Sequence, residues 1–309
     1  MLKSIKLWLE AARAPFFTAT IVPIALGAAI AWYSTGAFNT ALFLLTLIGG
    51  IFIHAGLDLS NDYFDHRSGA DEFNRNPTPF SGGSRMIQKG VLTPASMLAG
   101  AVICFAAGAI TGLYLNYLAP GNVILIIGLA GMFLAVFYTA GPVKIGYRGA
   151  GEAACAIGFG PLMVLGAYYV QAGSISMLPV YASVPVAVLI ALVLLINEFP
   201  DRDPDREAGK NTLVVIMGKK AAVKLYFISI AFVYLWPAAG VLLGVFPAIS
   251  LIVFITLPIS LKAARTAAGH YDKIKELIPA AAATIALHLV YGLLLAASFI
   301  LARLYFSAV

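Results

Sequence analysis

Long apolar segments, each about the length of a membrane-crossing helix, constrain the fold more than any other feature of this sequence. Of its 309 residues, 61% are hydrophobic. A helix needs about 20 mostly apolar residues to cross a bilayer, and helices satisfy their own backbone groups in lipid. The sequence therefore predicts an all-α integral membrane protein. We expect nine transmembrane helices around a central cavity, over residues 16–34, 40–59, 96–117, 121–140, 152–171, 178–197, 221–243, 246–264 and 277–303.

The chain contains no low-complexity tract and no segment typical of a soluble domain, so we expect one domain over residues 1–309. Glu10, Arg13 and Pro15 precede the first apolar run, which is atypical of a cleaved signal peptide, and we expect a retained first span. Two connections, residues 60–95 and 198–220, are long and contain several prolines and glycines. Connections of this length are usually functional, and we expect both to form helical caps.

Charged residues are unevenly distributed about the predicted spans. The connections after spans one, three, five and seven contain no Lys, Arg, Asp or Glu. Nineteen of the 20 basic residues lie in the N-terminal tail or in or beside the other connections, and all 14 acidic residues lie on that same side. The positive-inside rule places this side in the cytoplasm. We therefore expect an active site on the cytoplasmic face of the cell (inner) membrane.

The net charge of +6 does not indicate nucleic-acid binding. Basic residues beside membrane spans set orientation and contact anionic lipid, so membrane lipid is the partner that this charge predicts. Cys104 and Cys155 lie in or at apolar runs and lack metal-ligand spacing, which is typical of small core residues.

The first of two acidic clusters follows the second predicted span. If that helix continues, Asp58, Asp62 and Asp65 share one face and Asn61 borders it. Mg²⁺ commonly takes one or two carboxylates together with substrate phosphates, and carboxylates this close repel one another without a cation. We expect Asn61, Asp62, Asp65 and Asp71 to hold a metal. For Asp58, a supporting role at the metal and a structural hydrogen bond remain open.

The second cluster follows the sixth predicted span, and Asn197 comes 136 residues after Asn61. This offset indicates an internal repeat, in which spans one to four and five to eight are related units. Asn197, Asp201 and Asp205 follow one another at helical i, i+4 spacing, which predicts a second metal site. We expect the two clusters to face each other across one cavity and to hold two Mg²⁺ ions against a diphosphate. The expected catalytic residues are Asp62, Asp65, Asp201 and Asp205.

Basic and aromatic residues near the two clusters suit an anionic substrate. Five basic residues are expected to neutralise the diphosphate, namely Arg67, Lys144, Arg148, Arg202 and Lys210. Arg13 and Tyr138 are expected to contact an acceptor or to stabilise a cation, although a helix anchor and an interfacial tyrosine are the alternatives. A single histidine in a span, His54, is more typical of a hydrogen-bonded core residue. Glu198 remains open between a supporting group and a base.

Four motifs together resemble the UbiA superfamily of intramembrane prenyltransferases. They are NDYFD with SGAD, SGGSRMIQ, FYTAGPVKIGYRGAGE and NEFPDRDPDREAGKNTLVV. The resemblance covers nearly the whole chain, and the motifs are most similar to 1,4-dihydroxy-2-naphthoate polyprenyltransferases of menaquinone biosynthesis. The family's DxxxD motif corresponds to Asp201 and Asp205. The position four after Asp65 is Gly69, so Asp71 is the next acid, and NEFPD stands where NNxRD is common in the naphthoate branch.

The resemblance implies Mg²⁺-dependent transfer of a polyprenyl group from its diphosphate to an aromatic acceptor. Positive groups would neutralise the leaving diphosphate, and an apolar, aromatic-lined chamber would shelter the allylic cation. A carboxylate, Asp62 or Asp65, is a candidate to deprotonate the acceptor, and a hydroxynaphthoate would lose CO₂. The prenyl tail would leave the cavity sideways into lipid.

Other functions remain open from the sequence. Within the same class, the acceptor could be 4-hydroxybenzoate, homogentisate, a haem precursor, a carotenoid or a glycerol phosphate lipid. A cation-coupled transporter should carry ionisable residues near the middle of its spans, whereas these spans carry almost none. A CDP-alcohol phosphotransferase would require a DG and AR motif that neither acidic cluster shows.

Overall fold

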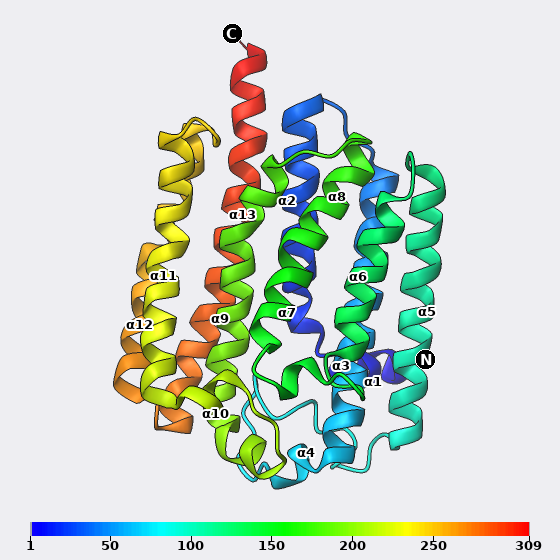
Figure 1. Cartoon of the computed structure of the whole chain (residues 1–309), viewed down its shortest axis with the longest axis vertical. Helices are drawn as coiled ribbons and strands as arrows, with labels where there is room; N and C mark the ends of the chain where they lie inside the picture. The colour runs from blue at the N-terminus through cyan, green and yellow to red at the C-terminus, as the bar shows by residue number, and fades with distance from the viewer. Residues whose placement is uncertain (1, 309) are drawn as a thin grey trace.

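The computed structural model describes residues 2–308 as a bundle of helices that run roughly along one direction (Figure 1). In chain order these are α1 (Leu2–Ala11), η1 (Ala14–Phe17), α2 (Thr18–Thr35), α3 (Thr40–Ser68), α4 (Ala70–Phe73), α5 (Pro94–Leu118), α6 (Val123–Phe137), η2 (Ile145–Tyr147), α7 (Gly151–Ile157), η3 (Gly158–Leu162), α8 (Met163–Ala172), α9 (Leu178–Glu207), α10 (Leu213–Met217), α11 (Lys219–Leu242), η4 (Ala248–Thr256), α12 (Leu257–His270) and α13 (Ile274–Ala308). Over this range no β-strand forms beyond a single bridge between Arg148 and Asn211. The all-α prediction is therefore confirmed.

Eight helical segments within residues 2–308 are long and apolar enough to cross a membrane. They are 14–35, 40–68, 94–118, 151–172, 178–207, 219–242, 248–270 and 274–305. Large apolar side chains such as Ile110, Ile126 and Leu235 are about two-thirds exposed on the outside of the bundle. An apolar outer surface of this kind is stable against lipid rather than water. The chain is an integral membrane protein.

The predicted count of nine spans is not confirmed. The expected fourth span, 121–140, forms the 15-residue helix α6, which is shorter than the other spans. The helix stops early because the carbonyl of Tyr138 accepts a hydrogen bond from the Gly146 amide at 2.8 Å, which closes a tight loop. This loop brings Tyr138 to the inner side of the bundle.

Two helices continue beyond their predicted ends. α3 runs to Ser68 and α9 runs to Glu207, so the first part of each predicted cap loop is a helical extension of a span. Proline normally disfavours a helix interior because it lacks an N–H group, but α9 includes Pro200 and Pro204 close to its polar end. Both acidic clusters therefore lie on rigid helices.

The polar ends of α3 and α9 meet the connecting segments at one end of the bundle, the lower end in Figure 1. α4 packs against both helices, and the segment after α9 is tied to η2 where the Asn211 amide donates to the Tyr147 carbonyl at 3.1 Å. At the opposite end lie the C-terminal turns of α13. The fold thus gathers the charged helix ends, α4 and residues 74–93, here called the cap, at one end of the bundle. The expectation of helical caps is not confirmed, because residues 74–93 form turns and bends rather than a helix.

Candidate active site

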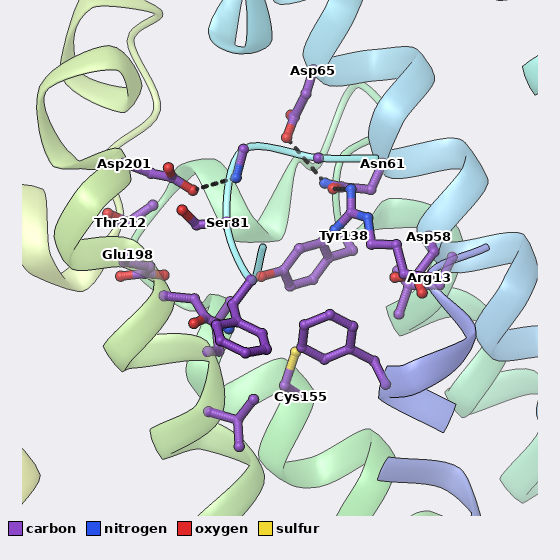
Figure 2. Close-up of a pocket in the computed structure, with 18 of the residues that line it drawn as sticks. Arg13, Asp58, Asn61, Asp65, Ser81, Tyr138, Cys155, Glu198, Asp201 and Thr212 are labelled. Atoms are coloured by element: carbon purple, nitrogen blue, oxygen red, sulfur yellow. Dashed lines mark hydrogen bonds between the residues drawn. The ribbon is translucent and has the colours of Figure 1, made fainter. Parts of the chain in front are cut away.

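A cavity of about 180 Å³ opens among the capped helix ends (Figure 2). Side chains of α3 face side chains of α9 across it, as the labelled Asn61 and Asp201 show. The predicted metal ligands that line it are Asn61, Asp65, Asp71, Asn197, Asp201 and Asp205, joined by Arg13, Tyr138 and Lys210. The structure therefore brings the two acidic clusters together around one space.

Lys210 connects the two clusters. Its ammonium group lies 3.0 Å from Oδ2 of Asp65 on α3 and 3.7 Å from Oδ1 of Asp205 on α9. Its backbone amide also donates to the Asp205 carbonyl at 2.7 Å. Burial opposes the charge of Lys210, but Asp205 and Asp65 together keep its pKa well above the ordinary value. Lys210 is thus a fixed positive charge between two carboxylates.

Asp65 accepts hydrogen bonds from Asn61 on the same helix and from two distant parts of the chain, at Tyr147 and Lys210. Its Oδ1 accepts a hydrogen bond from the Tyr147 hydroxyl at 2.7 Å, and its Oδ2 accepts from Asn61 at 3.2 Å and from Lys210. The Tyr147 hydroxyl also lies 2.7 Å from the Ser68 hydroxyl. Burial, followed by the charge of Asp65, raises the pKa of Tyr147, so Tyr147 stays a hydrogen-bond donor.

The Asp201 carboxylate is oriented by hydrogen bonds from Asn74 and Gly82 rather than by a basic side chain. Its Oδ1 accepts from the Asn74 side chain at 2.8 Å, and its Oδ2 accepts from the Gly82 amide at 3.0 Å. The two glycines Gly82 and Gly83 both have positive φ, of 80° and 75°, which is a conformation that favours glycine. The Ser81–Ser84 turn can therefore approach both acidic clusters closely.

Asp62 has a different set of partners from the other predicted ligands. Its carboxylate pairs with Arg13 and with the Ser84 hydroxyl, and it accepts from the Ser84 amide at 3.1 Å. Among the described residues it is not one of those that line the cavity. Its assignment as a metal ligand remains a prediction. In this structure the Asp62 carboxylate connects Arg13 and Ser84 to α3.

Arg13 and Tyr138 both line the cavity, and their contact with an acceptor or a cation stays a prediction. Arg13 donates to Asn61 at 3.1 Å as well as to Asp62. Burial opposes its charge, but Asp62 and Asp58 raise the pKa of the guanidinium, so it is a second fixed cation. Tyr138 projects into the centre of the site (Figure 2), and its burial raises the pKa of its hydroxyl well above the ordinary value.

Four of the five predicted diphosphate ligands do not line the cavity. Arg67 and Arg202 follow Asp65 and Asp201 by two residues and one residue, and these offsets turn them away from the inner helix face. Arg202 pairs with Asp203 at 3.0 Å. Arg148 donates to the Pro142 carbonyl at 3.0 Å. The Lys144 ammonium lies 5.1 Å from the centre of the Tyr147 ring, so only Lys210 of the five faces the site.

Sequence reasoning missed several residues that order the site, namely Asn74, Gly82, Gly83, Ser84 and Tyr147. The paired glycines between two serines were the available signal for the turn. Tyr147 offered none, because its contact with Asp65 joins residues 82 positions apart.

The donor set fits Mg²⁺ that is shared with a substrate. Within residues 2–308 no three acidic, His or Cys side chains converge as a metal centre of their own. Burial and the nearby Asp65 and Asp62 raise the pKa of the Asp71 carboxyl to about 8. A cation bound beside Asp71 would favour its charged form. A Cβ atom on Gly83 would lie 3.0 Å from Oδ2 of Asp71, so glycine keeps this side of the carboxylate open. Few carboxylates and room for phosphate oxygens are typical of Mg²⁺ sites.

The floor of the cavity is apolar. It is lined by Phe16, Ala19, Leu57, Phe159, Ile190, Val193 and Leu194. The protein is a membrane-embedded helical bundle whose cavity is polar at the capped end and apolar at the floor. These two features define an enzyme whose substrate has a charged head and a hydrocarbon body.

The family comparison agrees with this description. The model of the UbiA prenyltransferase family matches residues 20–278. The chain belongs to the UbiA prenyltransferase family, and it is a prenyltransferase.

Curated relatives align with most of the chain. The chain is 31% identical over 295 residues to 2-carboxy-1,4-naphthoquinone phytyltransferase of Synechocystis sp., covering 95% of this chain and 93% of the relative. It is 30% identical over 252 residues to 1,4-dihydroxy-2-naphthoate octaprenyltransferase of Bacillus subtilis, covering 82% and 78%. The enzyme of that name from Escherichia coli is 33% identical over 217 residues, covering 69% and 68%.

Solved structures share the architecture. A UbiA homologue from Archaeoglobus fulgidus, bound to DMAPP and Mg²⁺, matches with a TM-score of 0.66 and 16% identity, covering 94% of this chain and 99% of that one. The apo structure of a UbiA homologue from Aeropyrum pernix matches with a TM-score of 0.65 and 19% identity, covering 94% and 98%. At these identities the likeness shows the fold, and it confirms the UbiA-type helical bundle.

Proposed function

We propose that this protein transfers a polyprenyl group from polyprenyl diphosphate to an aromatic acceptor of the 1,4-dihydroxy-2-naphthoate class, as a step of menaquinone or related quinone biosynthesis. The observation that carries the proposal is the pairing of Asp65 and Asp205 across one cavity through Lys210. Opposed carboxylates with a fixed cation suit a metal-bound diphosphate. The acceptor class is supported by the names of the curated relatives.

The polar end of the cavity suits the diphosphate. Asn61, Asp65 and Asp71 from one side, and Asn197, Asp201 and Asp205 from the other, would hold two Mg²⁺ ions. When bound, Mg²⁺ would neutralise negative charge on the leaving diphosphate. Lys210 and Arg13 lie at the same end. Both side chains are already held in place, so they would stabilise that charge without reorganising.

The apolar floor suits the reacting allylic carbon. The ring of Tyr138 lies between Asp65 and Cys155 in the view of Figure 2, where its π-face can stabilise a developing cation. Phe16 and Phe159 line the same chamber and keep water from the cation. A prenyl tail would extend from here into the surrounding lipid.

The orientation of the enzyme follows from charge. The site lies at the end of the bundle where the basic residues gather, and the positive-inside rule assigns that end to the cytoplasmic side of the cell (inner) membrane. Both substrates, a soluble aromatic acid and a lipid diphosphate, can reach a cap at that surface. Residues 1–309 act as one prenyltransferase domain in this scheme.

The test is product formation by the purified full-length protein in lipid nanodiscs. Geranylgeranyl or phytyl diphosphate would be supplied with dihydroxynaphthoate, 4-hydroxybenzoate or homogentisate, with Mg²⁺ or with EDTA. We expect Mg²⁺-dependent prenylation of dihydroxynaphthoate with release of CO₂ and diphosphate. Preferred prenylation of another acceptor would overturn the acceptor assignment, and equal turnover in EDTA would overturn the metal assignment.

A further inference from the structure

Asp58 lines the cavity but lacks the partners that occupy the other carboxylates. It lies one helical turn before Asp62 on α3, so it faces the cavity below the metal-site residues. Asp62, Asp65 and Asp201 each accept at least two hydrogen bonds. The Oδ2 atom of Asp58 is buried and accepts none from the described residues. This carboxylate therefore has an acceptor oxygen that is not already used by the protein.

His54 is the side chain that orients Asp58. Its Nε2 atom lies 3.7 Å from Oδ2 of Asp58, and its Nδ1 atom lies 2.8 Å from the hydroxyl of Thr20 on α2. The imidazole packs against the rings of Phe17 and Phe159, with centroid distances of 5.3 and 4.7 Å. The Thr20 contact and the two aromatic rings hold the imidazole with Nε2 towards Asp58, at a distance longer than a hydrogen bond, so Oδ2 of Asp58 stays free to accept a proton.

The pair lies beside the apolar floor, where the proposed function would place the aromatic acceptor. Asp58 and His54 both line the cavity beside Leu57 and Phe159 of its apolar floor. The diphosphate end is one turn or more above, at Asp65 and Asp201. An acceptor ring that attacks the allylic carbon from the floor therefore places its hydroxyl at the level of Asp58.

We propose that Asp58, oriented by His54, accepts the hydroxyl proton of the aromatic acceptor during prenyl transfer. This inference rests on the proposed function and adds the base for it. The allylic C–O bond breaks and its electron pair leaves with the diphosphate. The ring carbon forms the new C–C bond as the hydroxyl proton moves to Asp58. The ring carboxylate then leaves as CO₂, and its electron pair restores the aromatic ring as Asp58 returns the proton to the ring oxygen.

The groups around Asp58 are consistent with this role. Arg13, from the segment before η1, lies beside it (Figure 2), and Tyr138 from the end of α6 and Cys155 from α7 line the same cavity. Asp62 is the neighbouring acid on α3, but it is already paired with Arg13. The sequence suggested Asp62 or Asp65 for this proton, and both are committed to donors. Glu198, which the sequence left open as a base, also lines the cavity from α9, but its Oε2 accepts from the Val214 amide at 3.4 Å. Of the described acidic side chains that line the cavity, Asp58 is the one with a buried oxygen that accepts no hydrogen bond.

The experiment compares Asp58→Asn with wild-type protein in nanodiscs. We expect kcat for dihydroxynaphthoate prenylation to fall about 100-fold or more, as is typical for loss of a general base. The Kd of a non-reactive prenyl thiolodiphosphate in Mg²⁺ should change less than threefold. Asp272→Asn, the same chemical change at an exposed position between α12 and α13, should leave both quantities unchanged.

Acceptors that differ in the acidity of their hydroxyl group distinguish a general base from a residue with a structural role. Ring-halogenated acceptors with an acidic hydroxyl are already ionised at assay pH, so they should recover at least tenfold of the lost kcat in Asp58→Asn. His54→Gln should give a smaller fall that the same acceptors also recover. Unchanged kcat in Asp58→Asn overturns the proposal, and so does a loss that no acidic acceptor recovers. Weakened thiolodiphosphate binding in Asp58→Asn would instead place Asp58 in the metal site.

Two further measurements distinguish failure of the proposed function from failure of the role assigned to Asp58. If wild-type protein prenylates none of the aromatic acids, the proposed function itself fails, independently of Asp58. If Asp58→Asn does not elute as a single folded species, the wild-type protein is used in single-turnover reactions across the acceptor series. The rate should then rise as the hydroxyl becomes more acidic until the hydroxyl is fully ionised, and a rate independent of hydroxyl acidity would overturn the proposal.

Discussion

The hydroxyl of Tyr147 lies 2.7 Å from Oδ1 of Asp65, on a carboxylate whose other oxygen is 3.0 Å from the Lys210 ammonium. The same ammonium lies 5.4 Å from the centre of the Tyr147 ring. Tyr147, Lys210 and Asp65 thus form one buried network that sets the direction of the carboxylate. Networks of this kind hold a site rigid only while every member is present.

Tyr147→Phe should lower kcat/KM by about tenfold, because a hydrogen bond to a charged group contributes roughly 1.5–3 kcal/mol. The ring and its packing are retained, so folding should be unaffected. The matched control is Tyr117→Phe, since Tyr117 is 83% exposed on α5 and should tolerate loss of its hydroxyl. Steady-state kinetics in nanodiscs measure both, and equal rates for the two variants would contradict the role of the Asp65 contact.

Lys210→Met should lower both activity and stability. Removing one partner of a buried ion pair leaves the other charge uncompensated, at a cost on the order of 3 kcal/mol. Mg²⁺ would replace the lost positive charge, so it should raise the melting temperature of the variant more than that of wild type. Lys220→Met at an exposed position on α11 is the control. A variant that melts as wild type does without Mg²⁺ would show that Lys210 is not needed between the clusters.

Gly83→Ala should be more harmful than Gly90→Ala. Both glycines have positive φ, 75° and 66°, so both substitutions carry a similar backbone cost of about 1–2 kcal/mol. The new Cβ at position 83 would meet Asp71 and Asp62 oxygens at 3.0 and 3.1 Å, whereas position 90 has no atom within 4 Å. We expect a loss of activity for Gly83→Ala alone. Similar activity of the two variants would contradict the close approach of the turn to the carboxylates.

Asp65→Ala and Asp201→Ala should each abolish turnover while the protein stays folded, and the isosteric Asp201→Asn should cost at least about 100-fold in kcat. Both residues line the cavity from opposite helices. Asp203→Asn provides the control on the same turn of α9, because Asp203 is 77% exposed. Assay and size-exclusion profiles would be compared, and near-normal turnover in either Asp65→Ala or Asp201→Ala would refute their assignment to the metal-diphosphate site.

Eight of the expected spans were predictable because they depend on local properties of the chain, whereas their sidedness stays a prediction. Hydropathy over about 20 residues locates a membrane helix, and charged connections set its direction. The length of α6 was not predictable in this way, because the helix ends where a loop hydrogen bond closes between Tyr138 and Gly146. The extension of α3 was considered only as a condition, and the extension of α9 was not expected, since Pro200 and Pro204 indicated a loop there.

The sequence by itself determined on which helix face the oxygen-bearing side chains of each cluster gather, because the i, i+4 spacing within a cluster fixes one face. It could not decide which basic residues turn towards that face. Lys210 reaches Asp65 across 145 positions, while Arg202, beside Asp201, turns to Asp203. Only tertiary structure made these choices, because a contact between distant segments depends on how the helices pack and where the cap closes, and no local pattern encodes either.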